Sequence, residues 1–253
     1  MASPIRVTEF TDPTCSWAWG SEPKVRRLGW CHGRVLEWRR VMGGLLAPDW
    51  RGDHGVTDPT YYTNPKYLRR SMQYHATVSE TTGMPFPGRL EWLPFSSHEA
   101  CLAVKAAELQ GHDQAGRLLR RLREDWYVFG RPPGTRRQTL DSAASVAGID
   151  VARMERDLDD RATEAAFLAD WEEHRNPNEY VLGLDDDRVG YGAARPHRGR
   201  TRYGLPTLIF TGPGGERTVA GWRPWEDYEG ALRAVAGAEG LPPARPLPAP
   251  ERW

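Results

Sequence analysis

Cysteine, lysine and long apolar runs are all scarce in this chain of 253 residues. The three cysteines, Cys15, Cys31 and Cys101, are too few and too widely spaced for a disulfide scaffold. No apolar run approaches the ~20 residues that a membrane-spanning helix needs. The segment Met1–Phe10 also lacks the basic and apolar stretches of a secretory signal. We therefore expect a cytoplasmic protein.

No excess of charge of either sign is present, because 34 basic residues balance 34 acidic ones. This balance argues against a nucleic-acid-binding module driven by bulk charge, and we expect neither nucleic acid nor membrane as a partner. What the chain does have is a hydrophobic fraction of 39%, with eleven tryptophans. That content is enough to build a core and excludes wholesale disorder.

Local sequence patterns predict strands at both ends of the chain and helices between them. Apolar runs bounded by glycine and proline predict strands over 5–10, 34–41, 206–210 and 216–220. Helical spacing predicts helices over 16–28, 65–80 and 224–235, and a block of several helices over 97–175. The order is β-α-β, a helical insertion, then β-β-α.

This order predicts one α/β domain whose sequence is split by an insertion. We assign 1–60 and 200–240 to the α/β domain, 61–199 to a helical insertion with loops, and 241–253 to a proline-rich, frayed tail. The polar segment 176–202 is predicted to be one long loop.

Cys15 is the one thiol with a physical reason to be reactive. It lies where the first strand ends and the first helix begins. Unpaired backbone N–H groups and the helix dipole favour a thiolate at such a position, so we expect a lowered pKa and a nucleophilic sulfur.

The segment around Cys15, FTDPTCSWAWGSEP over residues 10–23, resembles the active-site turn of DsbA-like thioredoxin-fold proteins. Further similarity lies in residues 37–44, 100–111 and 204–210, the last reading GLPTLIF. Relatives of this kind include disulfide oxidoreductases, kappa-class glutathione transferases and 2-hydroxychromene-2-carboxylate isomerases. The resemblance implies an α/β thioredoxin-like fold with an all-α insertion. It also implies a cis Pro206 opposite Cys15, with the Leu205 backbone placed to bind substrate.

The sequence departs from the dithiol members of that family. Its motif is Cys15-Ser16-Trp17-Ala18, so the second cysteine that resolves a mixed disulfide is absent. Cys31 is expected ~20 Å away along the helix, beyond the ~7 Å limit between Cα atoms of a disulfide. A lone thiol can act as a covalent nucleophile, exchange with a small thiol, or help to bind a thiol cofactor. By resemblance, that cofactor is of the glutathione or mycothiol type, with Ser16 in contact.

Two other residues are candidates for the site. Trp17 follows the cysteine closely and is predicted to form a wall of an apolar pocket. His98 begins the first insertion helix, expected to lie over the site, and is our candidate general acid or base. The histidines show neither metal-ligand spacing nor a CxxC partner, so we predict no metal.

Together these features favour thiol-dependent isomerisation, transfer or redox chemistry on a small apolar or aromatic metabolite, with that small molecule as the partner. A homodimer is also considered. The first alternative is a monothiol protein-disulfide oxidoreductase. The second is a non-catalytic adaptor that keeps the fold but has lost the redox motif.

Overall fold

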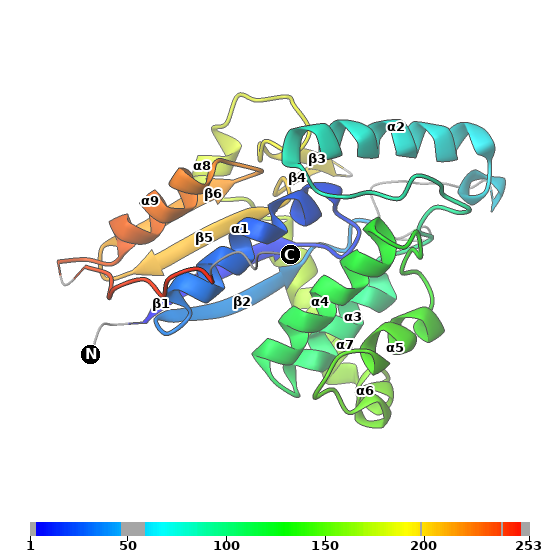
Figure 1. Cartoon of the computed structure of the whole chain (residues 1–253), viewed down its shortest axis with the longest axis horizontal. Coiled ribbons are helices and arrows are strands. Elements are labelled where there is room, and N and C mark those ends of the chain that lie inside the picture. The colour runs from blue at the N-terminus through cyan, green and yellow to red at the C-terminus, as the bar shows by residue number, and fades with distance from the viewer. Residues whose placement is uncertain (1–3, 47–58, 198, 239, 249–253) are drawn as a thin grey trace.

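The computed structural model describes residues 4–46, 59–197, 199–238 and 240–248 (Figure 1). The strands are β1 (Ile5–Thr11), β2 (Leu36–Met42), β3 (Arg195–His197), β4 (Arg200–Arg202), β5 (Thr207–Gly212) and β6 (Gly215–Ala220). The helices of the first half are α1 (Ser16–His32), the 3-10 helix η1 (Pro59–Tyr62), α2 (Pro65–Thr82), α3 (His98–Glu108) and α4 (His112–Tyr127). Those that follow are α5 (Arg136–Ala144), α6 (Val151–Asp157), α7 (Arg161–His174), α8 (Glu179–Leu182) and α9 (Trp225–Val235).

A mixed sheet with the order β2-β1-β5-β6 forms the centre of the α/β domain. The β1–β2 pair is parallel, whereas β1–β5 and β5–β6 are antiparallel. The parallel pair needs a crossover, and α1 supplies it. This is the thioredoxin-like arrangement that the resemblance implies, and all four predicted strands are present.

The central position of β1 explains why its side chains are buried on both faces. On one face, Ile5 and Val7 pack with residues of α1 and α9, including Leu28 and Leu232. On the other face, Phe10 stacks on Tyr203 with ring centroids 4.0 Å apart. The end of β1, which leads into Cys15, is therefore held between two packed layers.

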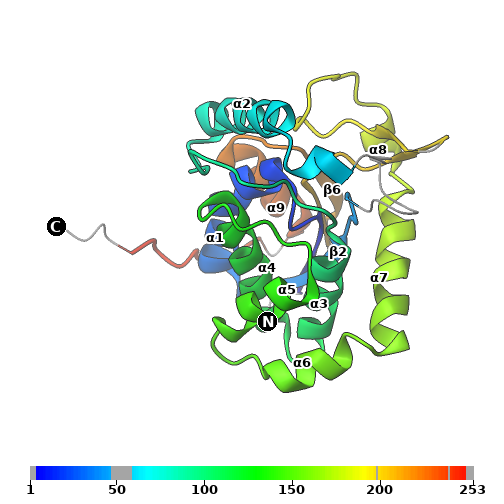
Figure 2. The same cartoon turned by 90° about the vertical axis from the view of Figure 1, so that its right-hand side faces the viewer.

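The insertion between β2 and β5 contains α2 to α8. Figure 2 shows α2 across the top and α3 to α6 in a separate block below it. Local capping begins and ends α2: the Asn64 side chain accepts from the Lys66 N–H, Pro65 opens the helix, and Gly83 closes it at a φ of 73°. The lower block has its own core of small and aliphatic side chains from α3, α4, α5, α6 and α7.

Three expectations about local structure were wrong. The segment 176–202 is not a single loop, because it contains α8 and the β3–β4 hairpin. Helix α1 passes Gly29 and ends at His32, which places Cys31 in its last turn. The tail is not frayed over residues 241–248: the Arg245 N–H donates to the Cys31 carbonyl, and the Trp30 indole donates to the Pro246 carbonyl.

Part of the predicted organisation lies outside the described residues, namely residues 47–58 of the predicted α/β domain and the last five residues of the tail. Within the described chain, none of the helices combines the length and apolar character needed to cross a bilayer.

Candidate functional site

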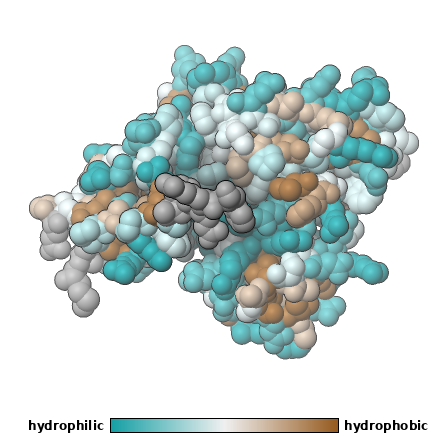
Figure 3. All heavy atoms as spheres, viewed as in Figure 1, coloured by the Kyte–Doolittle hydropathy of each residue, from teal (hydrophilic) through white to brown (hydrophobic). Residues whose placement is uncertain are grey.

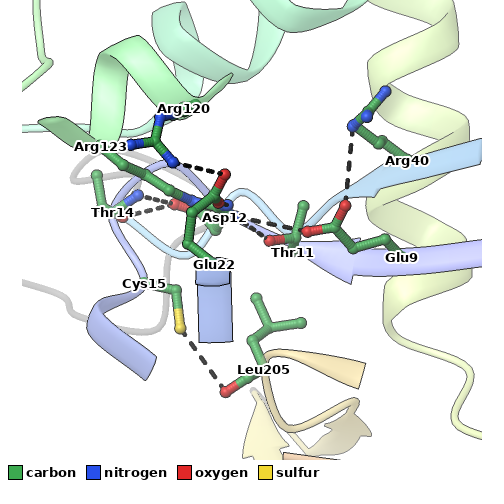
Figure 4. Close-up of polar contacts among 10 residues, drawn as sticks. All are labelled: Glu9, Thr11, Asp12, Thr14, Cys15, Glu22, Arg40, Arg120, Arg123 and Leu205. Carbon is green, nitrogen blue, oxygen red and sulfur yellow. Dashed lines mark hydrogen bonds and ion pairs between the residues drawn. The ribbon is translucent and has the colours of Figure 1, made fainter. Parts of the chain in front are cut away.

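Cys15 occupies the N-cap position of α1, as the sequence predicts. Its backbone is extended, with a φ of −87° and a ψ of 111°, and its side chain makes no capping hydrogen bond. Its thiol instead points toward the loop before β5 and donates to the carbonyl oxygen of Leu205, with Sγ and O 3.7 Å apart (Figure 4). The Leu205–Pro206 peptide bond is cis. Two segments at opposite ends of the chain thus meet at this sulfur.

The expected acidity of Cys15 is wrong in direction. Burial raises the pKa of this thiol to about 11, and the nearby Asp12 carboxylate raises it further. The backbone N–H groups of Ala18 and Trp17 and the Arg123 guanidinium do lower the pKa, but desolvation outweighs them. At neutral pH, Cys15 is therefore a protonated thiol that can donate a hydrogen bond.

The other two cysteines do not complete a dithiol centre in the described structure. Cys31 is 16 positions further along α1, or about 24 Å at the helical rise. Cys101 is fully buried in α3, and its Sγ donates to Asp12 Oδ2 at 3.6 Å. All three cysteines are free thiols.

Asp12 holds the turn before Cys15 in place. Its Oδ1 accepts from the backbone N–H and the hydroxyl of Thr14, at 2.8 and 2.6 Å. Its Oδ2 accepts from the Leu45 N–H and the Ser97 hydroxyl, at 2.9 and 3.1 Å. This fully buried carboxylate thus ties the turn to the segment after β2 and to the start of α3.

A buried ionic cluster lies beside the turn (Figure 4). The Arg123 side chain is 1% exposed and donates to Glu22 Oε2 at 2.6 Å. It also donates to the Thr11 hydroxyl and lies 3.7 Å from Glu9 Oε1. Arg40 contacts the other oxygen of Glu9 at 3.7 Å. The cluster joins α4 to β1 and α1 next to the turn that carries Cys15.

Cys15 forms part of the lining of a pocket of about 690 Å³. The segments that surround it include the turn at 14–17, one face of α2, the end of α4, the β3–β4 hairpin and residues 204–205, with further lining from 45–46, 61–62, 93–95 and 189–190. The side chains that α2 contributes are Tyr67, Arg70, Ser71, Tyr74 and His75. Trp126 and Tyr127 of α4 close the far side, and the Tyr127 hydroxyl donates to the Thr14 carbonyl at 2.5 Å.

Most of the predicted site residues meet at this pocket. Ser16, Trp17 and Leu205 line it together with Cys15. The Trp17 indole donates to the Tyr74 hydroxyl at 2.7 Å, which joins α1 to α2 at the pocket wall. Pro206 is buried behind the lining, and its carbonyl accepts from the Gly221 N–H at 2.7 Å.

His98 is not among the described residues that line the pocket. It begins α3, but its ring packs edge-on against Phe167 of α7, with centroids 5.2 Å apart. The structure thus does not bring the expected acid–base residue to the thiol, because α2, rather than α3, covers the site.

His75 is the histidine that sequence reasoning missed. It is 5% exposed, and its ring is surrounded by Phe86, Trp126 and Tyr127. Burial lowers its pKa to about 4, so it is neutral at physiological pH. The spacing of Tyr67, Arg70, Ser71, Tyr74 and His75 on one face of the predicted helix was the available signal.

The described residues contain no group of His, Cys, Asp and Glu side chains able to hold a metal ion. The groups that could contact a thiol cofactor are the Cys15 thiol, the Ser16 hydroxyl and the arginines at the pocket rim. The geometry can bind a molecule or segment against a protonated thiol, but the described pocket lining supplies no second thiol and no carboxylate.

Solved structures resemble the chain over nearly its whole length. The crystal structure of a protein disulfide isomerase candidate from Nitrosomonas europaea covers 91% of this chain and 96% of its own, with a TM-score of 0.66 and 17% identity. The cytosolic disulfide reductase DsbM from Pseudomonas aeruginosa covers 90% of this chain and 93% of its own, with a TM-score of 0.60 and 18% identity. At these identities the likeness establishes the fold alone.

The curated relatives are named as adapter proteins, whereas the solved structures are named as disulfide isomerases or reductases. The ClpXP adapter protein SpxH of Halalkalibacterium halodurans is 31% identical over 170 residues, which is 66% of this chain and 53% of that protein. The chain therefore spans about half the length of the curated relatives it matches. The expectation that the partner is a small-molecule substrate is wrong by this comparison, because the name of these relatives points to a protein partner.

A protein-family model described as thioredoxin matches residues 9–175, which run from the end of β1 through Cys15 to the end of the helical block. This match covers about two thirds of the sequence. The chain belongs to the thioredoxin family.

Proposed function

We propose that this chain is a protein-binding module of the adapter type, and that the pocket above Cys15 receives a segment of its partner protein. The observation that carries the proposal is the state of Cys15. It is a buried, protonated thiol bonded to the Leu205 carbonyl, with no second cysteine in its turn. Such a thiol supports the pocket wall by packing and by its internal hydrogen bond to Leu205, and it completes no redox cycle.

The relatives support this proposal over a dithiol enzyme. Their name is that of an adapter, and the matched part covers 66% of this chain. A dithiol oxidoreductase needs a resolving cysteine, which the motif Cys15-Ser16-Trp17-Ala18 lacks.

The shape of the pocket suits a protein segment. Its volume of about 690 Å³ lies within the range of ~300–1,000 Å³ found for ligand pockets, which leaves room for a side chain of a partner segment. Its walls are rich in tyrosine and tryptophan, which are enriched at protein interfaces because they combine a large apolar surface with a polar tip.

The test uses the full chain, immobilised through a C-terminal tag, to capture and identify a partner from its native host. The purified partner is then titrated calorimetrically against wild type, Cys15→Ala and Ser71→Trp. Ser71 lines the pocket, so a tryptophan there fills it. We expect Cys15→Ala to bind within about twofold of wild type, and Ser71→Trp to lose roughly tenfold or more in affinity.

Thr77→Trp is the matched control, because Thr77 is an exposed residue of the same helix outside the pocket lining. Equal losses in Ser71→Trp and Thr77→Trp would place binding elsewhere. If Cys15→Ala lost binding but kept a normal melting temperature, the function would depend on the thiol itself, and the proposal would be contradicted.

A second candidate function is reversible capping of Cys15 by a low-molecular-weight thiol of the glutathione or mycothiol type. The observation that favours it is that Cys15 and Ser16 both line the open pocket. In this reaction the Cys15 thiolate attacks a small disulfide, its S–S bond breaks, one thiolate leaves, and a mixed disulfide forms. The Cys15 proton passes to solvent, and a further small thiol must release the cap.

The capping reaction is tested by intact mass spectrometry after incubation with oxidised glutathione at pH 7 and pH 9. A mass increase of one glutathionyl group on Cys15 at pH 7 would favour capping, whereas modification confined to Cys31 would rule it out. We retain a cytoplasmic location as part of the proposal.

A further inference from the structure

The pocket is cationic at its rim. Three arginines line it, Arg70 of α2, Arg195 of β3 and Arg202 of β4. Over the described residues, its lining includes neither aspartate nor glutamate. Asp12, the carboxylate nearest to Cys15, is fully buried behind the turn. A ligand in the pocket therefore meets positive charge that the described lining does not neutralise.

Arg70 and Arg195 are the two lining arginines whose positive charge can attract an anionic ligand. Arg70 lies exposed on α2, one helical turn after Tyr67 and one before Tyr74, and no acidic group of the described chain pairs with it. Arg195 uses its guanidinium to bond the carbonyl oxygens of Asp187 and Arg188. These carbonyls orient the guanidinium without cancelling its charge. Its field reaches the pocket wall, since it lowers the pKa of Tyr74 against the larger, opposing effect of burial.

The β3–β4 hairpin concentrates this charge. Arg195 and Arg202 are directly opposite each other in the hairpin register. Like charges at such positions repel, so the hairpin is a costly arrangement that an anion would stabilise. Arg202 also donates to the Tyr203 carbonyl and has other contacts, so we assign recognition to Arg70 and Arg195.

Below the rim, the pocket is aromatic and uncharged. Trp126, Tyr127 and neutral His75 form this part of the lining. His75 Nδ1 is buried and has no hydrogen-bond partner. A buried polar atom left unsatisfied costs about 1–3 kcal/mol, so a ligand with a hydrogen-bonding group at this depth would gain affinity.

We propose that the pocket recognises an extended acidic segment of a partner protein. Its carboxylates bind Arg70 and Arg195, and an apolar or aromatic side chain between them enters the aromatic part of the pocket. Arginine suits this role because its planar guanidinium can hold a carboxylate through two parallel hydrogen bonds. This inference rests on the proposed protein-binding function and extends it to the chemical class of the partner.

The test uses two hexapeptide probes on the full chain, acetyl-Glu-Leu-Glu-Tyr-Glu-Leu-amide and the same peptide with glutamine for each glutamate. The readout is the rate at which iodoacetamide labels Cys15 at pH 9. Because Cys15 lines the pocket, a bound peptide slows its labelling. Cys31, in the last turn of α1, is the internal reference and should label at an unchanged rate.

We expect the glutamate peptide to protect Cys15 and the glutamine peptide to protect it much less. Arg70→Gln should weaken protection by roughly three- to tenfold, and added salt should weaken it further. Arg69→Gln is the matched control, because this exposed neighbour on α2 does not line the pocket. Arg195→Gln should act like Arg70→Gln, and Arg195→Lys should recover part of the protection.

Equal protection by the two peptides, or equal effects of Arg70→Gln and Arg69→Gln, would overturn acidic recognition. Protection by reduced glutathione that Arg70→Gln and Arg195→Gln leave unchanged would also overturn it and assign the pocket to a small thiol. The proposed protein-binding function is tested by a different result, namely whether the captured partner loses affinity for Ser71→Trp. A partner that binds the pocket without acidic selectivity would leave that function standing.

Discussion

The thiol of Cys15 and the carbonyl oxygen of Leu205 are 3.7 Å apart, although 190 positions separate the two residues in the sequence. The carbonyl belongs to the residue before the cis proline, and the thiol to the N-cap of α1. In the described structure, the sulfur donates to a backbone acceptor and no second thiol competes for it.

Restoring the missing cysteine should restore redox chemistry. Ala18 follows Cys15 by three positions in α1, a separation that brings Cα atoms within the ~7 Å range of a disulfide. We expect Ala18→Cys to form a 15–18 disulfide on oxidation and to raise reduction of insulin by dithiothreitol roughly tenfold or more over wild type. Ala18→Ser is the control. Wild-type activity equal to that of Ala18→Cys would show that Cys15 needs no resolving thiol.

Stability should fall in mild acid because of His75. Its pKa is about 4 in the folded chain, against 6.5 for the free side chain, so the unfolded state binds more protons between these values. The free energy of unfolding should therefore decrease as pH falls from about 6.5 to 4, by up to about 3 kcal/mol from this residue.

Urea titrations at pH 7, 5.5 and 4.5 measure this effect in wild type and in His75→Phe. The variant should lose stability less steeply, and the remaining slope is expected from His174, whose pKa burial also lowers. An unchanged slope in His75→Phe would mean that His75 is protonated in the folded chain.

The buried ionic cluster should be sensitive to the loss of one member. Arg123→Met leaves Glu22 and Glu9 buried without their shared cation, so we expect a loss of about 3–5 kcal/mol in the free energy of unfolding. Arg137→Met, at a side chain that is 92% exposed, should change stability little. Urea unfolding compares the two variants, and similar small losses in both would show that the cluster contributes no net stability.

Local patterns were sufficient to predict the strand, turn and helix around Cys15. Apolar runs marked β1, β2, β5 and β6, whereas the loop that meets the thiol was implied by the family resemblance of the GLPTLIF segment. The β3–β4 hairpin was missed because its three-residue, arginine-rich strands carry no apolar alternation. These short strands are defined by their pairing with each other, which a short stretch of sequence does not show.

The chemistry of the site was harder to predict than its position. The helix N-terminus correctly indicated groups that lower the pKa of Cys15, but the opposing burial arises from packing by α2, α4 and the loop before β5. For the same reason the sequence indicated His98 and gave no direct indication of His75. Which helix covers a pocket is a property of the tertiary structure, although the aromatic stripe on α2 pointed to it.

The central claim, that Cys15 is a protonated binding-site thiol rather than an activated nucleophile, is tested most directly by its alkylation rate against pH. Iodoacetamide labelling of native protein is followed by peptide mass spectrometry from pH 7 to pH 10. With a pKa of about 11, the Cys15 rate should rise about tenfold per pH unit across this whole range. A rate that levels off below pH 9 would contradict the claim, because it would reveal a thiolate already formed under physiological conditions.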